Sequence, residues 1–198
     1  MMSSLKNALG RVLILAGALA LLCWGYLSLQ QLWFEKTASY LLEQRLLSSS
    51  RFMGRHKAKH NPGIVATRPG EILGRIEIPR IHLSAMILEG ADSNSLRFGA
   101  GHVQGTALPG AKGNVAIAAH RDTFFRPLRE VRPNDTILLT TVAGVYRYRV
   151  EGTEIVDPTD VQVLKRTRDS QLTLVTCYPF YYVGSAPKRF IVHTRLQV

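Results

Sequence analysis

The chain has 198 residues, which is enough for one domain of ordinary size and an additional segment. Its 25 lysines and arginines against 14 aspartates and glutamates give a formal net charge of +11. This balance favours an anionic partner, such as a lipid surface, a nucleic acid or an acidic wall polymer. The two cysteines, Cys23 and Cys177, are too few for a scaffold held together by disulfides.

The first predicted element is a hydrophobic helix close to the N-terminus. The run VLILAGALALLCWGYLSL, Val12–Leu29, carries no charge over 18 residues, which is near the lower limit for crossing a bilayer. Lys6 and Arg11 precede it, and basic residues favour the cytoplasmic side of a membrane. We therefore predict a cytoplasmic segment over residues 1–11 and a single transmembrane anchor in the plasma membrane over residues 12–34.

Two other interpretations of this run stay open. A cleaved signal peptide would use the small residues at Ala18–Ala20, although apolar residues follow them directly. A lipoprotein signal would use Cys23, although Leu22 is bulky for the position before an acylated cysteine. In an uncleaved anchor, Cys23 lies in lipid and cannot pair with Cys177 in an outer domain. A free thiol outside the cytoplasm is unusual, so Cys177 becomes a candidate for chemistry.

Residues 35–68 are predicted to form a helical stalk followed by a basic linker. Leu32–Leu47 combines good helix formers with an apolar stripe. Ser48–Gly63 combines serine, glycine and proline with four basic residues, which is typical of a flexible segment near anionic head groups. The linker has no interleaved aromatic platform, so we expect no nucleic-acid partner.

From about Pro69 onward the pattern changes to short β-rich runs broken by turn residues. YRYRV alternates like a half-exposed strand, whereas VAIAA and ILL are continuous, as in strands buried on both faces. The sequence contains no evident helix of three turns. We therefore predict an all-β barrel or sandwich over residues 69–198. The predicted strands are GRIEIPRI, NVAIAAH, DTILLTT, VYRYRVEGTEIV, LTLVTC and RFIVHTRL.

Candidate catalytic groups stand at the ends of these runs. A cysteine nucleophile needs groups that favour the thiolate, protonate the leaving group and stabilise an oxyanion. Cys177 ends LTLVTC and Arg189 opens RFIVHTRL, at positions symmetric about Val183 in a proposed antiparallel pair. Cross-strand partners lie side by side, so the guanidinium would lie next to the sulfur, where it would favour the thiolate and donate hydrogen bonds to an oxyanion. A register slip of one residue would separate them, and the alternation does not fix the register.

His120 is the preferred general acid, because the apolar run NVAIAAH delivers it to the rim of a sheet. His193, within the strand after Arg189, is the second candidate among the six histidines, and His102 is expected in a loop. Each residue also has an inert interpretation. Cys177 taken alone is more often a buried small hydrophobe, Arg189 a solvated side chain, and a histidine a satisfied polar residue.

Three stretches resemble the sortases, membrane-anchored cysteine transpeptidases of bacterial surfaces. TLVTC matches the TLxTC signature of the family, and Gly101–Leu128 resembles the segment that carries its catalytic histidine. CYPFYYVGSAPKRFIV is most like the class D branch, where Tyr-Pro-Phe follows the cysteine and the arginine comes twelve residues later. The resemblance covers about Gly74–Leu196, with the motifs in the same order and spacing.

The resemblance implies a closed eight-stranded β-barrel with short helical turns, preceded by the transmembrane helix. It implies that Cys177 is the nucleophile, His120 the general acid/base and Arg189 the stabiliser of the transition state. Thr176, before the cysteine, would contact substrate or support the oxyanion, although it also fits as an ordinary β-branched strand residue. Asp122 would orient His120 or cap the following turn, of which we favour the cap.

The implied reaction is cleavage of an LPxT-like C-terminal sorting signal in a secreted protein. A thioacyl enzyme would then pass the protein to an amine acceptor such as a cell-wall precursor, or to water, as in a thiol protease or hydrolase. Pro158–Gln171 precedes the strand of Cys177 and has few core residues, so it is a candidate substrate-facing loop, although it fits equally as a solvated connection. We expect no cofactor and no metal, because the sequence has no compact carboxylate cluster that would hold calcium.

Two other functions remain in competition. An L,D-transpeptidase that cross-links peptidoglycan also combines an all-β domain with cysteine and histidine, but Val175 and Thr176 replace the Ser-His-Gly stretch expected before its cysteine. A non-catalytic β-domain that binds acidic wall polymer would leave Cys177 packed in an apolar cage without a histidine in reach.

Overall fold

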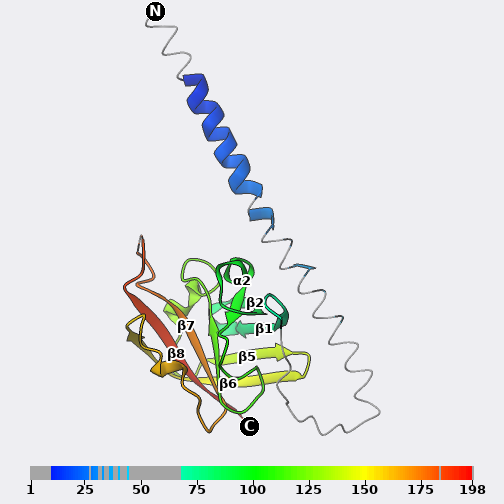
Figure 1. Ribbon diagram of the computed structural model, residues 1–198, viewed down its shortest axis with the longest axis vertical. Coiled ribbons are helices and arrows are strands. Elements are labelled where there is room, and N and C mark those ends of the chain that lie inside the picture. The colour runs from blue at the N-terminus through cyan, green and yellow to red at the C-terminus, as the bar shows by residue number, and fades with distance from the viewer. Residues whose placement is uncertain are drawn as a thin grey trace, which may run out of the picture.

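The computed structural model contains a long N-terminal helix and a β-barrel (Figure 1). It describes residues 10–26, 28–30, 33, 36, 37, 40, 44, 68–182 and 184–197. The helix, Gly10–Gln30, is long and apolar enough to cross a membrane, and most of its described residues are exposed, although a signal sequence has the same features. The predicted basic linker lies outside the described residues, and the predicted stalk lies largely outside them.

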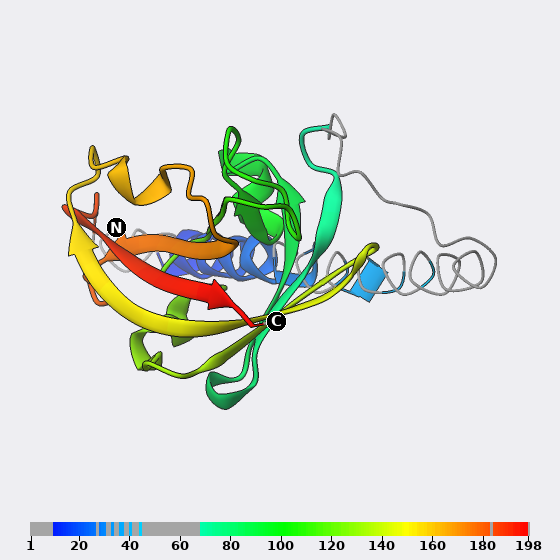
Figure 2. The ribbon, with the colours of Figure 1, turned by 90° about the horizontal axis from the view of Figure 1, so that it is seen from below.

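Eight strands form a closed barrel, in the order β1-β2-β3-β4-β7-β8-β6-β5 (Figures 1 and 2). This confirms the predicted fold. Closure pairs every strand on both sides, so the sheet has no free edge. The strands are β1 (Ile72–Ile78), β2 (Leu83–Glu89), β3 (Ala100–His102), β4 (Asn114–Ala118), β5 (Thr136–Thr141), β6 (Gly144–Val156), β7 (Gln171–Tyr178) and β8 (Lys188–Leu196).

Short helical turns connect the strands, as the family resemblance implied. The helix α2 begins after Asp92, whose carboxylate accepts hydrogen bonds from the backbone N–H groups of Asn94 and Ser95 at 2.9 and 3.2 Å. Asp92 therefore fixes the turn between β2 and β3. The helical segments of the barrel are η1 (Pro79–Ile81), α2 (Ser93–Phe98), η2 (Arg126–Glu130) and η3 (Gln162–Leu164).

The core fills the inside of the barrel with aliphatic side chains from alternating positions. On β1 the buried residues are Gly74, Ile76 and Ile78, which is the period of two expected of a strand with one buried face. Val115–Ile117 on β4 is buried without interruption, so this strand is covered on both faces, as its continuous apolar run predicted. The buried strand β4 thus gives a rigid support for the residues that follow it.

The order of the strands brings distant parts of the chain to one end of the barrel. β4 and β7 are parallel neighbours, and β7 and β8 are antiparallel neighbours. The C-terminal ends of β4 and β7 and the N-terminal end of β8 therefore meet at the same end of the barrel, whose rim is called its edge below. Figures 1 and 2 both show β7, in orange, beside β8, in red.

A buried phenol in the barrel gives a first prediction. Tyr148, on β6, is fully buried, and its Oη has no hydrogen-bond partner among the described residues. Burial raises the pKa of Tyr148 to about 12, and the nearby Tyr146 contributes in the same direction. The unfolded phenol ionises near pH 10, so the folded state keeps its proton over a range in which the unfolded state loses it. Stability is therefore lost as the pH rises from about 10 to about 12.

The substitution Tyr148→Phe removes the unpaired hydroxyl and should stabilise the fold by about 1–3 kcal/mol at neutral pH. It should also reduce the loss of stability between pH 9 and pH 11. The measurement is urea unfolding of the full chain in detergent at pH 7.5, 9 and 11. Tyr182→Phe, which alters a half-exposed ring, is the matched control and should change little. A loss of stability in Tyr148→Phe would show that the hydroxyl has a stabilising partner.

Candidate active site

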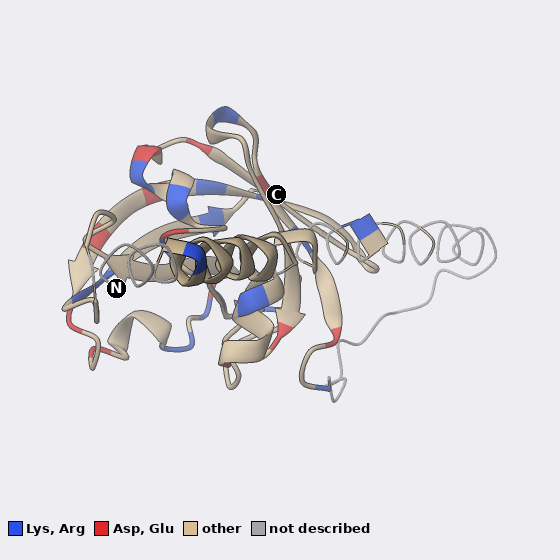
Figure 3. Ribbon diagram, turned by 90° about the horizontal axis from the view of Figure 1, so that it is seen from above, with Lys and Arg blue, Asp and Glu red and all other residues tan. Residues whose placement is uncertain are grey.

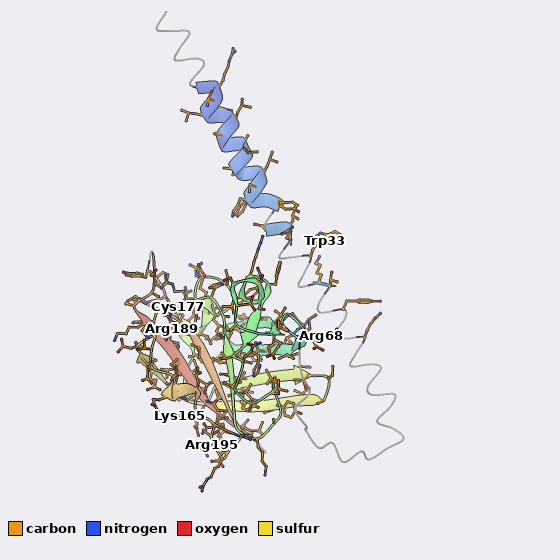
Figure 4. All side chains as sticks on the ribbon, in the orientation of Figure 1. Trp33, Arg68, Lys165, Cys177, Arg189 and Arg195 are labelled. Carbon is orange, nitrogen blue, oxygen red and sulfur yellow. The ribbon has the colours of Figure 1, made fainter. Side chains whose placement is uncertain are left out.

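Cys177 and Arg189 are direct cross-strand partners in the antiparallel pair of β7 and β8. This confirms the register that the symmetry about Val183 predicted, although Val183 itself lies outside the described residues. Figure 4 labels both residues at one end of the barrel. Cys177 is a half-buried free thiol, so it is held by a strand and still accessible.

The guanidinium of Arg189 is held by backbone carbonyls at the start of β8. Its Nη1 donates to the carbonyl oxygen of Ala186 at 3.2 Å and to that of Lys188 at 3.0 Å. Arginine has five N–H donors on three nitrogens, so these contacts leave donors for another acceptor. The side chain is half-buried and is thus both fixed and partly open to a ligand.

His120 follows the end of β4, two residues beyond its last paired position. Ala118 pairs with Val175, and the N–H of Ala119 continues the ladder by donating to the carbonyl of Val175 at 3.2 Å. Extending this parallel register by two residues brings His120 level with Cys177 on the adjacent strand. The imidazole is exposed. The backbone therefore brings the third candidate residue to the same edge of the barrel.

Thr176 has a buried hydroxyl that joins β7 to the segment leading to His120. Its Oγ1 donates to the carbonyl of Ala119 at 2.7 Å, and the residue is buried. The sequence suggested contact with substrate or oxyanion for Thr176, and the structure places its hydroxyl on the backbone one residue before His120. Asp122 is exposed and makes no hydrogen bond to His120 among the contacts of the described residues.

Two arginines tie the segment after His120 to the loop between Cys177 and Arg189. Arg121 Nη2 donates to the carbonyls of Tyr182 at 2.7 Å and Gly184 at 3.1 Å, and its guanidinium lies 5.7 Å from the ring of Tyr182. In the same way, the guanidinium of Arg129 lies 5.6 Å from the ring of Tyr181. We did not predict these contacts; the signal was the Tyr-Tyr pair in one loop and arginines in the other.

Three aromatic rings pack at the base of the β7–β8 loop. The rings of Tyr178 and Phe180 meet edge to face with centroids 6.0 Å apart, and Phe180 meets Phe190 at 5.2 Å. Tyr178 stacks on Phe190 at 6.3 Å. These contacts fix both ends of the loop directly beside Cys177 and Arg189.

Two other histidines lie away from Cys177, and each is paired with a glutamate. His193 pairs across the sheet with Thr173, four residues along β7 from Cys177, which is about 13 Å at the usual rise of a strand. Its Nε2 lies 2.6 Å from Glu154 on the neighbouring strand. His102, which we expected in a loop, lies in β3 and is buried against Glu89. Neither ring is placed to serve Cys177.

Charges of both signs are interspersed over the barrel (Figure 3). The excess of positive charge is greater toward the N-terminus, where residues 1–67 hold 8 of the 25 basic residues but 2 of the 14 acidic ones. Among the described residues, no group of three or more histidines, cysteines, aspartates and glutamates is arranged to hold a metal ion.

Comparisons with known proteins agree with this arrangement. The family model of the sortase domain matches residues 76–197. Sortase D of Bacillus subtilis (strain 168) is 35% identical over 146 residues, covering 73% of this chain and 71% of the relative. Sortase A of Listeria monocytogenes is 33% identical over 110 residues, covering 54% of this chain and 49% of the relative.

Solved structures show the same fold. A Clostridium perfringens sortase D5 transpeptidase superimposes with a TM-score of 0.64 at 24% identity, covering 80% of this chain and 99% of that one. A Listeria monocytogenes sortase A structure gives a TM-score of 0.59 at 29% identity, covering 64% of this chain and 88% of that one. From the matched domain and the shared barrel we conclude that this chain belongs to the sortase family of cysteine transpeptidases and is most like class D.

Proposed function

We propose that this sortase cleaves an LPxT-like C-terminal sorting signal through a thioacyl intermediate on Cys177 and transfers the protein to an amine. The observation that carries the proposal is the strand register that brings Cys177, Arg189 and His120 to one edge of the barrel. The match to the sortase family disfavours both an L,D-transpeptidase and a non-catalytic wall-binding domain.

In the first half of the reaction, the sulfur of Cys177 attacks the carbonyl carbon of the scissile peptide bond. Remaining N–H donors of Arg189, together with backbone amides, stabilise the oxygen as it becomes an oxyanion. His120, which holds the proton given up by the thiol, donates it to the departing amine as the carbon–nitrogen bond breaks. The products are a thioester on Cys177 and the free C-terminal fragment.

The second half of the reaction reverses these roles. An amine nucleophile loses a proton to His120 as it attacks the thioester carbon, and the thiolate of Cys177 leaves. A new peptide bond results, and the thiol regains its proton from the imidazole. Water in place of the amine would give hydrolysis, so the choice of acceptor depends on what enters the site.

The N-terminal helix would place this chemistry outside the plasma membrane. We propose that residues 1–11 are cytoplasmic, residues 12–34 cross the bilayer, residues 35–68 form a stalk and linker, and residues 69–198 form the extracytoplasmic catalytic domain. The apolar helix Gly10–Gln30 supports the anchor, and Lys6 and Arg11 before the apolar run support a cytoplasmic N-terminus. A cell-wall precursor is then an accessible amine acceptor.

The test is incubation of the full chain in detergent with a library of peptides that vary around an LPxT core. A related structure, sortase C of Clostridium perfringens, has been solved with a C-terminal cell wall sorting motif, which motivates this choice of probe. Mass spectrometry should find an acyl adduct on the peptide that contains Cys177, and added triglycine should convert it to a ligated product. No adduct with any member of the library, from a folded chain, would contradict the proposed substrate class.

A further inference from the structure

Asn114, the first residue of β4, is a buried polar residue that the proposed reaction does not use. Its exposed fraction is 3%. A buried amide is costly unless its donors and acceptor are paired, so its partners show what it holds. All of its partners lie on other segments of the chain.

The amide of Asn114 joins a loop to a strand. Its Nδ2 donates to the carbonyl of Val163 at 3.0 Å and to that of Lys165 at 3.3 Å, both in or next to η3. Its Oδ1 accepts a hydrogen bond from the hydroxyl of Thr173, on β7, at 2.8 Å. Thr173 is 1% exposed, so water does not compete for this bond. The Thr173 hydroxyl therefore orients the amide so that its nitrogen faces the loop carbonyls.

The backbone beside Asn114 packs closely on the same loop. Gly113 has a φ of +120°, and a Cβ at this position would lie 3.3 Å from Ala107 Cβ and 3.6 Å from Arg166 Cγ. Its carbonyl accepts a hydrogen bond from the N–H of Gln171 at 2.9 Å. The second half of the loop is thus docked where β4 and β7 begin.

The first half of the loop starts at the active-site edge. Val156, the last residue of β6, pairs with Arg189, and the carboxylate of Asp157 lies 2.8 Å from Nζ of Lys188. The loop therefore runs from beside Arg189 to the other end of β7, as the positions of Arg189 and Lys165 in Figure 4 show. Between these two attachments lies Val161, an apolar residue whose exposed fraction is 63%.

We propose that Asn114 and Thr173 are positioning residues that hold the loop over residues 157–170 in the conformation that binds the substrate peptide. This inference rests on the proposed function, because the loop acts on the substrate only if the edge at Cys177 is the active site. Thr173 lies four residues from Cys177 along β7, about 13 Å, so the pair acts through the loop and does not touch the reacting atoms. Loss of the pair should therefore weaken substrate binding more than it slows the chemical steps.

Two variants test the pair and keep its shape. Asn114→Asp turns the donor nitrogen into an oxygen that faces two carbonyls, and Thr173→Val removes the hydroxyl that orients the amide. Thr194→Val is the matched control, because Thr194 is equally buried and donates at 2.8 Å to Leu172, a residue of β7 outside the loop. All three variants are compared as full chains in detergent after circular dichroism confirms that they are folded.

The first readout does not depend on activity. Lys165, Arg166 and Arg168 are trypsin sites within the loop, so release of the loop exposes them to cleavage. Cleavage at these sites should be at least about tenfold faster in Asn114→Asp and about threefold faster in Thr173→Val than in the unmodified chain. Thr194→Val should match the unmodified chain. Unchanged cleavage in both folded variants would overturn the proposal.

The second readout is the split between KM and kcat with the peptide that forms the thioacyl adduct. KM should rise about tenfold in Asn114→Asp, with kcat within about twofold of the unmodified chain. Faster cleavage with unchanged KM would overturn the role in substrate binding. If the unmodified chain forms no adduct, the proposed function fails and with it the role in binding, whereas the cleavage rates still decide whether the pair holds the loop.

Discussion

Replacing Cys177 with alanine is expected to abolish the acyl adduct and to lower transpeptidation by a factor of at least about 1,000. Neither Arg189 nor Thr176 can replace the sulfur, because Arg189 is a cation, and the hydroxyl of Thr176 is buried and donates to Ala119. The fold should be unaffected, since Cys177 is half-buried and the substitution removes only its sulfur atom. Mass spectrometry and a ligation assay with triglycine measure the two effects.

Cys23→Ala is the matched control, because Cys23 is the only other thiol and lies in the N-terminal helix. It should ligate at the unmodified rate. A methanethiosulfonate reagent adds a second test, since a thiol activated by its neighbours should react rapidly. Labelling of Cys177 should slow in His120→Ala and in Arg189→Ala. A folded Cys177→Ala protein with full ligation activity would end the cysteine mechanism.

Replacing Glu89 with leucine is expected to lower the free energy of unfolding by about 3–5 kcal/mol. Glu89 and His102 are 5% and 2% exposed, and Oε2 of the carboxylate lies 2.9 Å from Nδ1 of the ring. The other ring nitrogen faces the carbonyl of Ala107 at 3.0 Å. Each ring nitrogen of His102 therefore has an oxygen partner. Without Glu89, the buried Nδ1 is left without a partner, and breaking one side of a buried polar pair is costly.

A double replacement separates two contributions to the loss of stability: the buried ring left without its partner, and the altered packing. Glu89→Leu/His102→Leu removes both polar groups, so it should recover much of the stability that the single replacement loses. Glu154→Gln is the control, because Glu154 and His193 form a similar pair on an exposed face, where water screens the interaction and the loss should be far smaller. Urea unfolding of the full chains gives the values. A Glu89→Leu chain as stable as the unmodified one would show that the pair does not support the fold.

The sequence was sufficient for those parts of the barrel that repeat a clear pattern. Strands β4, β5, β6, β7 and β8 are long or strongly apolar, so their alternation or continuity marked them. The structure confirms the pairing of Cys177 with Arg189 that was proposed from their symmetry about Val183, although the alternation of the two strands did not fix this register. β3 has three residues, two of them alanine and glycine, and carries no usable period, so His102 was expected in a loop.

The sequence placed the candidate residues Cys177, His120 and Arg189 at strand ends, and the structure brings these strand ends together, whereas the contacts between loops were not predicted. Arg121 reaches carbonyls 61 and 63 residues away, and Asn114 reaches Val163 across the β6–β7 loop. Such bonds go to backbone atoms, which every residue has, so no residue type at the far end reveals them. They become visible only when the barrel has placed the loops together.

The position of β8 has a consequence for how the enzyme matures. β8 is the last strand along the chain, yet it lies between β7 and β6 and closes the barrel. During synthesis from the N-terminus, the strand that carries Cys177 is therefore made before β8, its second neighbour, exists. On the proposed mechanism, Cys177 gains its arginine partner only when β8 is added, so a chain truncated before β8 should be inactive.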